Sequence, residues 1–205
     1  MLKIKVVRHG QNEDNAAGIL NGHRNLPLTD LGKDQGREIA RHLKDTGEVF
    51  DAVYASPLMR AFDTAEIITG GIGTAPPKVL DLIIERDFGS MTGKPVSDIE
   101  PLCAPRIIKT PTVTYFIDPP GAETFPALRD RAQRALDHLH ALHPKGSLLL
   151  VCHGDIGKML YAAYYGLSWR EVLTEFHFGN SEMILLKKGL SHRDAKIFCQ
   201  PQYNL

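Results

Sequence analysis

Two histidines are the residues of this chain best suited to chemistry, because each follows a strongly apolar run and is itself followed by glycine. The first lies in the triplet Arg-His-Gly at positions 8–10, directly after the apolar run 4–7. The second lies in the pair His-Gly at 153–154, directly after the run 148–152. Such runs are typical of buried strands. In a parallel sheet the loops at the carboxyl ends of the strands share one edge, where ligands bind. We therefore expect the two histidines to face each other across one pocket.

Further charged and hydroxyl side chains are expected at the same edge. Ser56-Pro57 is a strong helix start, with a hydroxyl at the cap and proline in the first turn, and Arg60 would lie one turn inside that helix. Glu85 follows an expected strand over 79–84. A helix N-terminus, two arginines and two histidines in one place suit the binding of a dianionic phosphoryl group.

Helical and extended patterns alternate along most of the chain. A helix over 29–47 would be capped by Thr29 and end at Gly47. This alternation predicts an α/β fold, a three-layer α/β/α sandwich with a mostly parallel central sheet. The other expected strands cover 49–55, 147–152, 182–187 and 195–199, and the other expected helices cover 56–69, 128–139 and 157–167.

Two stretches depart from this alternation. Residues 11–29, rich in Asn and Gly, are interpreted as a long functional loop. Residues 94–120 contain repeated prolines, so we expect an insertion with one or two short helices that roofs the pocket over the sheet edge. The insertion side chains expected to set leaving-group preference are Arg106, Lys109, Tyr115 and Phe116.

Composition narrows the class of protein. The chain has 205 residues, 43% of them hydrophobic and 23% charged, with a formal net charge of +0. These values are ordinary for a soluble globular protein, expected here as a single domain over 1–205. The absence of a basic block argues against nucleic-acid and membrane-surface partners. Three widely spaced cysteines, no apolar leader and no membrane-spanning run predict a cytoplasmic protein. The expected partner is a small molecule, and a homodimer is left open.

Taken in order along the chain, these segments resemble the histidine phosphatase superfamily, also called the phosphoglycerate-mutase-like family. The signature of that family is an Arg-His-Gly triplet after the first strand. Where the family usually carries Thr or Ser shortly after the triplet, this chain has Asn12. The segments that carry the resemblance are 8–10, 21–32, 56–65, 85–93, 120–124 and 151–154.

The resemblance implies phosphoryl transfer through a histidine. His9 would be the nucleophile that forms phosphohistidine, and it must be neutral at one nitrogen to attack phosphorus. Glu85 would protonate the leaving oxygen and then deprotonate the attacking water. No metal and no cofactor are implied, because arginines supply the charge. The resemblance assigns the phosphoryl oxygens to Arg8, Arg60 and His153, and substrate contacts to Asn15, Asn21, Gly22 and Gly154.

Some residues have competing interpretations. Glu123 and Asp87 are rival proton carriers to Glu85, although Glu123 is better suited to bracing the site or a loop. The histidines at 138, 140 and 143 do not share one helix face, which disfavours a metal site. Cys152 is interpreted as a small core residue beneath the pocket, not as a nucleophile.

Three functions are compatible with these residues. The leading expectation is a metal-independent phosphomonoesterase that acts through phosphohistidine on a small phosphorylated metabolite. The alternative is a phosphoglycerate mutase, which returns the phosphoryl group to the substrate. Mutases of the family that depend on bisphosphoglycerate carry a longer insertion with an adjacent arginine pair, whereas this chain has only Arg106 there, which favours hydrolysis. The third is a catalytically silent protein that binds a phosphorylated ligand, which the intact His9 and Glu85 disfavour.

Overall fold

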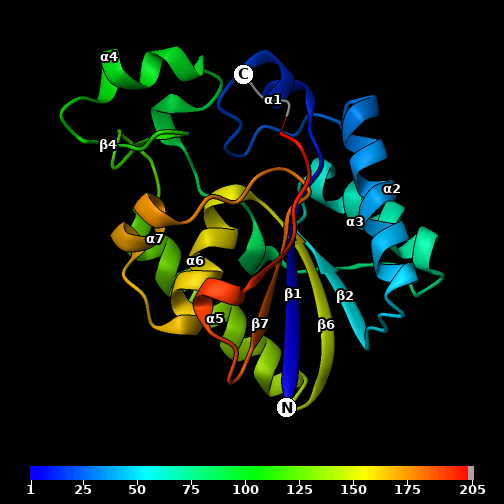
Figure 1. Cartoon of the computed structure of the whole chain (residues 1–205). Helices are drawn as coiled ribbons and strands as arrows, with labels where there is room; N and C mark the ends of the chain where they lie inside the picture. Colours follow the sequence, from blue (N-terminus) through cyan, green and yellow to red (C-terminus); the bar gives the residue numbers. More distant parts are fainter. Residues whose placement is uncertain (203–205) are drawn as a thin grey trace.

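A six-stranded sheet forms the centre of the computed structural model, which describes residues 1–202 (Figure 1). Strands β1, β6, β2 and β3 are mutually parallel, and β7 and β8 extend the sheet in antiparallel fashion. This arrangement confirms the predicted mostly parallel sheet. In spatial order the strands are β3 (Lys78–Val79), β2 (Ala52–Ala55), β6 (Gly146–Cys152), β1 (Leu2–Arg8), β7 (Met183–Lys187) and β8 (Lys196–Phe198).

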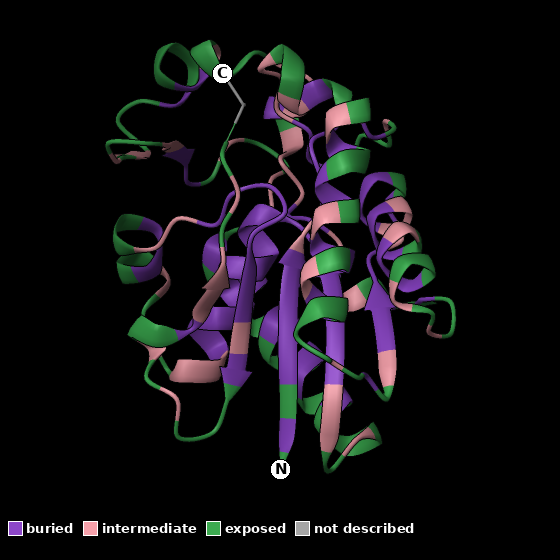
Figure 2. Ribbon diagram, turned by 45° about the vertical axis from the view of Figure 1, so that its right-hand side comes forward, coloured by how far each residue is buried: buried purple, intermediate pink, exposed green. Residues whose placement is uncertain are grey.

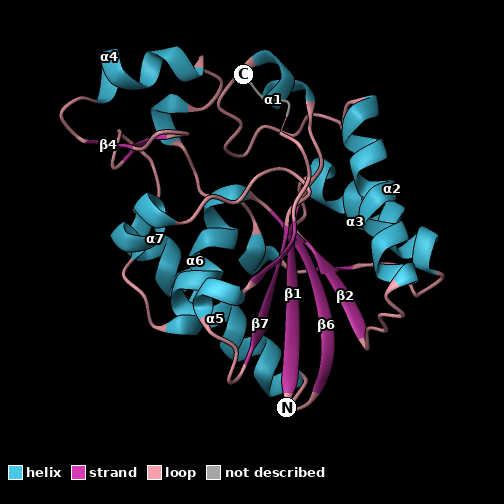
Figure 3. Cartoon of the chain, in the orientation of Figure 1, coloured by secondary structure: helices cyan, strands magenta, loops and turns pink. Residues whose placement is uncertain are grey.

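Helices cover both faces of this sheet, which completes the predicted three-layer sandwich (Figure 3). Side chains alternate along β1, so Ile4 and Val6 pack into one core cluster while Val7 packs into the other. Figure 2 shows the central strands buried between the helical layers. One layer contains α2 (Asp30–Asp45) and α3 (Met59–Ile72), and the other contains α5 (Phe125–Leu142), α6 (Gly154–Tyr165) and α7 (Trp169–Glu175).

The segment 11–29, expected as a loop, contains the short helix α1 (Glu13–Ala17). Asn12 caps this helix: its side chain accepts a hydrogen bond from the Asn15 amide, and the Asn15 side chain bonds back to the Asn12 amide. An amide at position 12 therefore performs a capping role that a hydroxyl residue also performs.

Several predicted element bounds are wrong; helix α6, for example, begins at Gly154 instead of Gly157. The strand expected over 79–84 is only the two-residue β3, because Asp81–Ile83 form a 3₁₀ turn. Helix α3 begins at Met59 after Leu58 instead of at Ser56, and it continues through Gly70 and Gly71 to end where Gly73 adopts φ 72°. The three remaining 3₁₀ turns span Gly89–Met91, Val96–Asp98 and His192–Asp194.

The proline-rich insertion lies above the upper edge of the sheet in Figure 1. It contains α4 (Ile99–Cys103) and a hairpin of β4 (Ile107–Lys109) and β5 (Thr114–Phe116). Phe116 packs with Met91 and Ile99 in a core cluster separate from the two main ones. Across residues 1–202, none of the helices has the length and apolar character needed to cross a bilayer.

Candidate active site

The two histidines meet at the carboxyl ends of β1 and β6. These strands are neighbours and parallel, with Arg8 opposite Cys152, so the next residue of each strand, His9 and His153, enters the same space. Their ring centroids lie 5.1 Å apart and their planes are inclined by 63°. Both side chains are almost completely buried. The structure therefore brings together the two residues on which the sequence argument depends.

His9 is held in the tautomer that a nucleophile needs. Its Nδ1 lies 2.6 Å from the carbonyl oxygen of Gly10, and since a carbonyl only accepts, Nδ1 carries the proton. The lone pair is then on Nε2, which accepts a hydrogen bond from Arg60 Nε at 3.2 Å. Burial, followed by the charges of Arg60 and Arg8, lowers the pKa of His9 well below its ordinary value. His9 is therefore neutral near pH 7.

Arg60 links helix α3 to the loop between α1 and α2. Its two terminal nitrogens donate to the carbonyls of Arg24 at 2.7 Å and Gly22 at 2.9 Å, while Nε points at His9. Burial is the main cause that lowers the pKa of Arg60 to about 10, so the group stays charged at neutral pH. A planar guanidinium with donors in three directions suits this position, and a lysine would not replace it.

Arg8 and His153 each present a buried polar atom without a hydrogen-bond partner among the described residues. Arg8 donates from Nη1 to the Phe178 carbonyl at 2.8 Å, while its Nε has no partner. His153 Nε2 lies 2.7 Å from Ser56 Oγ, while its Nδ1 has none. Burial and then Arg60 lower the pKa of His153 well below its usual value. Unpaired polar atoms beside two buried guanidiniums make a site that suits phosphoryl oxygens.

Glu85 approaches this cluster from the turn after β3. Its carboxylate accepts hydrogen bonds from the backbone amides of Arg86 at 2.9 Å, Ile156 at 3.2 Å and Asp155 at 3.4 Å, the last two from the first turn of α6. Within residues 1–202, no cationic side chain forms an ion pair with it. The Glu85 carboxylate is thus positioned by backbone amides.

The two rival carboxylates are engaged in structural contacts. Glu123 forms an ion pair with Arg131 at 2.6 Å, and Arg131 in turn donates to the carbonyls of Leu82 and Ile84. Asp87 accepts from the Gly89 amide at 2.8 Å within a turn. Glu123 thus braces the loop that carries Glu85, and the geometry favours Glu85 as the proton carrier.

The residues expected to contact substrate lie around the same cluster. The side-chain amides of Asn12 and Asn21 are hydrogen bonded to each other at 2.6 and 3.2 Å. Gly22 has φ 49°, and its carbonyl receives the Arg60 bond. At Gly154 a side-chain Cβ would lie 3.5 Å from the Arg8 guanidinium carbon, an ordinary van der Waals distance that places Gly154 beside Arg8.

The loop between α7 and β7 also contributes to the site, and the sequence pattern did not indicate it. Asn180 Nδ2 donates to the His9 carbonyl at 3.0 Å and to Asn15 Oδ1 at 3.2 Å. The Ser181 amide donates to the Arg8 carbonyl at 3.0 Å, and Ser181 has φ 56°. Asn180 is far from His9 in sequence, and the Gly-Asn-Ser stretch 179–181 gives no signal beyond that of a turn.

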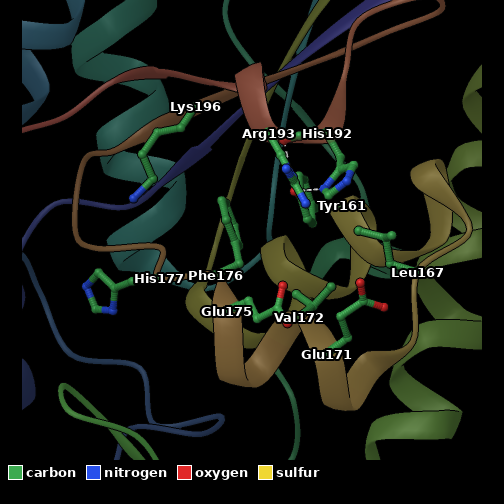
Figure 4. Close-up of a pocket in the computed structure, with 10 residues that line it drawn as sticks. All are labelled: Tyr161, Leu167, Glu171, Val172, Glu175, Phe176, His177, His192, Arg193 and Lys196. Carbon is green, nitrogen blue, oxygen red and sulfur yellow. Dashed lines mark hydrogen bonds between the residues drawn. The ribbon is translucent and has the colours of Figure 1, made fainter.

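A separate cavity of about 470 Å³ lies between α6, α7 and the segment 192–196 (Figure 4). None of the residues proposed for catalysis lines it. In Figure 4 the His177 imidazole is turned away from the other residues that line it. Groups of three or more metal-binding side chains are absent from residues 1–202, and His140 and His143 instead bond to Leu136 and Tyr54.

Comparisons with known proteins agree with this geometry. A 2,3-bisphosphoglycerate-dependent phosphoglycerate mutase from Mesorhizobium japonicum is 30% identical over 177 residues, which cover 83% of this chain and 84% of the mutase. A mycobacterial glucosyl-3-phosphoglycerate phosphatase superposes with a TM-score of 0.78 at 22% identity, covering 95% of each chain. An Entamoeba histolytica phosphoserine phosphatase superposes with a TM-score of 0.72 at 22% identity, covering 90% of each chain.

These two structural neighbours establish the fold, and the family is established by the sequence. The family model of the histidine phosphatase superfamily (branch 1) matches residues 4–192, which include both histidines, Arg60 and Glu85. The chain belongs to the histidine phosphatase superfamily, branch 1.

Proposed function

We propose that this protein is a phosphomonoesterase that hydrolyses a small phosphorylated metabolite through a phosphohistidine formed on His9. The observation that carries the proposal is the state of His9: neutral, with Nδ1 tied to the Gly10 carbonyl and the Nε2 lone pair directed at Arg60. A histidine in this state, 5.1 Å from a second buried histidine and beside two arginines, is suited to in-line attack on a bound phosphoryl group.

The reaction proceeds in two steps. In the first, His9 Nε2 attacks phosphorus, the bond from phosphorus to the leaving oxygen breaks, and Glu85 gives that oxygen a proton. In the second, Glu85 takes a proton from water, the resulting oxygen attacks phosphorus, and the nitrogen–phosphorus bond breaks to restore His9. Arg8, Arg60 and His153 hold the phosphoryl oxygens, and one such contact contributes about 3 kcal/mol to the transition state.

A mutase reaction is the second candidate, since the Mesorhizobium japonicum relative carries that name. The observation that favours hydrolysis is the state of Arg106, the one arginine of the insertion. Its side chain is 64% exposed and paired with Asp118. It therefore provides no arginine pair directed at a substrate carboxylate.

The test uses purified protein and an aryl phosphate, 4-nitrophenyl phosphate. Wild-type protein should release phosphate, and His9→Ala should reduce this release roughly 10⁴-fold or more. A rapid acid-free quench of the wild type should trap phosphorus on His9, detected by mass spectrometry. A parallel assay for conversion of 3- to 2-phosphoglycerate separates the candidates. Retained turnover by His9→Ala would refute the nucleophile assignment, and faster isomerisation than phosphate release would favour the mutase.

A further inference from the structure

The mechanism described so far does not use Lys158, a buried lysine on helix α6. This residue is only 4% exposed. Its ammonium lies 3.8 Å from Asp155 Oδ1 and 4.8 Å from the centroid of the Tyr115 ring. Among residues 1–202 it forms no hydrogen bond closer than this contact. A lysine side chain with so little exposure and so loose an ion pair is unusual, because burial removes most of the water contacts that stabilise its charge.

The charge on Lys158 is not balanced by its neighbours. Within residues 1–202, Asp155 is the one acid that forms an ion pair with it, and the other carboxylate oxygen of Asp155 accepts a hydrogen bond from Arg86 Nε at 2.9 Å. Arg86 has the shorter and better contact, so one carboxylate faces two cations. Glu182, a further acid in this part of the fold, is occupied by Lys196 at 2.8 Å and by the Gly179 amide.

His177 supplies no negative charge that could balance the Lys158 ammonium. Burial first, and then the Lys158 ammonium, lower the pKa of His177 to about 4, so its imidazole is neutral near pH 7. Its Nδ1 is buried without a hydrogen-bond partner in the described part of the chain.

Lys158 lies close to the residues proposed to bind the phosphoryl group and to protonate the leaving oxygen. The start of α6 abuts the phosphoryl site at Gly154, next to Arg8. The amides of 155 and 156 then hold the Glu85 carboxylate, which protonates the leaving oxygen. Lys158 follows one turn after Gly154, about 6 Å further along the helix axis. The helix therefore presents, in order, the phosphoryl site, the proton carrier and an uncompensated ammonium.

The insertion covers Lys158 with an aromatic ring, and two of its cations are occupied elsewhere. Tyr115 of β5 lies over the ammonium. The two insertion cations expected to select the leaving group are paired with acids of the insertion instead, Arg106 with Asp118 and Lys109 with Glu100, and their side chains are 64% and 58% exposed. Within residues 1–202, Lys158 is thus a buried and loosely paired cation close to the proposed proton carrier.

We propose that Lys158 is a specificity-determining residue that binds a second anionic group, a carboxylate or a second phosphate, on the leaving group of the substrate. This inference rests on the proposed phosphomonoesterase function and narrows its substrate class. The second anion supplies the counter-charge that Asp155 cannot, and Tyr115 keeps water from screening the contact.

Matched substrates test this assignment. The first pair is 3-phosphoglycerate and glycerol 3-phosphate, which differ in a carboxylate. The second pair is propanediol bisphosphate and its monophosphate, which differ in a phosphate. We expect wild-type protein to prefer the anionic member of at least one pair by about tenfold or more in kcat/KM, the effect of one charge-assisted hydrogen bond. Lys158→Met should abolish that preference mainly through KM, and Lys158→Arg should retain part of it.

Controls separate the possible failures. Lys188→Met, at an exposed lysine beyond β7, should keep the wild-type preference. If Lys158→Met does not fold, Lys158→Gln takes its place. Absence of preference in both pairs, or a preference unchanged in the Lys158 variant, overturns the inference while aryl phosphate turnover still supports the phosphatase. If no ester is turned over, the phosphatase proposal fails, and calorimetric Kd values for the same pairs decide: equal affinities overturn the subsite.

Discussion

The sheet edge around His9 and the insertion above it use charged side chains in opposite ways. At the edge, His9, Arg60 and His153 are at most 2% exposed, and their polar contacts are with one another, with backbone carbonyls or with the Ser56 hydroxyl. In the insertion, Arg106 and Lys109 are mostly exposed and paired with nearby carboxylates. Exposed charges are screened by water and salt, whereas buried charges act strongly on a ligand that enters among them.

This difference separates two tasks. The buried edge holds the groups proposed for phosphoryl transfer, on the ends of β1 and β6, on helix α3 and on the turn after β3. The insertion supplies the covering surface through Tyr115 and Phe116, both buried, while the charged groups of Arg106 and Lys109 lie at the surface. Substitutions at the edge should therefore have large effects on catalysis, and substitutions of the insertion charges small ones.

Arg60→Met should show the largest of these effects. The guanidinium donates to His9 and to the carbonyls of Gly22 and Arg24, so its loss removes a phosphoryl contact and frees the substrate loop. We expect kcat/KM on 4-nitrophenyl phosphate to fall about 10²- to 10³-fold. Arg60→Lys should recover little, because a single ammonium cannot donate in three fixed directions. Near-wild-type turnover by either variant would mean that Arg60 has only a packing role.

Glu85→Gln sharpens the comparison within the edge, with Glu123→Gln as the matched control. The Glu85 variant should slow alkyl phosphates about 10²-fold but aryl phosphates much less, because a good leaving group needs no proton. Glu123→Gln weakens the pair with Arg131 and should lower thermal stability without this leaving-group dependence. Steady-state kinetics on a series of leaving groups checks both. If the rate depended on the leaving group equally in the two variants, the assignment of Glu85 would be contradicted.

Buried neutral histidines should also make folding sensitive to acid. The pKa values of His9 and His153 lie well below the value of about 6.5 for an exposed histidine. Below that pH the unfolded chain binds protons that the folded chain does not, so the free energy of unfolding falls as pH falls. Between pH 6.5 and 5.5 each group should contribute about 1 kcal/mol of this loss.

Urea unfolding of the wild type and of His153→Gln, each at pH 6.5 and at pH 5.5, measures this loss of unfolding free energy. The variant should lose less stability over this interval than the wild type. Identical losses would show that His153 does not titrate between folded and unfolded chains in this window.

Asn180→Ala tests the support behind His9. The amide bonds to the His9 carbonyl and to Asn15, so its loss should lower kcat about tenfold with little change in KM. Gln133→Ala on the exposed face of α5, which also removes a side-chain amide contact, is the control. A change in KM alone would place Asn180 in substrate binding instead of positioning.

Arg106→Ala should have the smallest effect, within about twofold in kcat/KM for any phosphate ester, since an exposed ion pair contributes little. A selective tenfold loss of kcat/KM on substrates with a second anionic group would contradict the contrast between edge and insertion, because the insertion would then supply a substrate-binding charge.

Much of this site was predictable because it follows from strand periodicity. Apolar runs that end in Arg8-His9 and in His153 indicate two buried strands, and parallel neighbours place their ends together. Glu85 was predicted at the correct edge of the sheet, although most of the strand predicted before it is a 3₁₀ turn. The prediction depended only on where the chain leaves the sheet. Ser56 was placed correctly but given the wrong role: its hydroxyl contacts His153, and Leu58 precedes the helix.

The sequence by itself determined the order of strands and helices and the residue types at the sheet edge, because local periodicity and turn chemistry act over a few neighbouring residues. Only the tertiary structure decided that Asn180 supports His9, that Arg106 and Lys109 face solvent, and that Lys158 is buried beside a carboxylate already occupied by Arg86. These outcomes depend on contacts between segments far apart along the chain. Burial then sets the strength of each charge, and no local pattern encodes it.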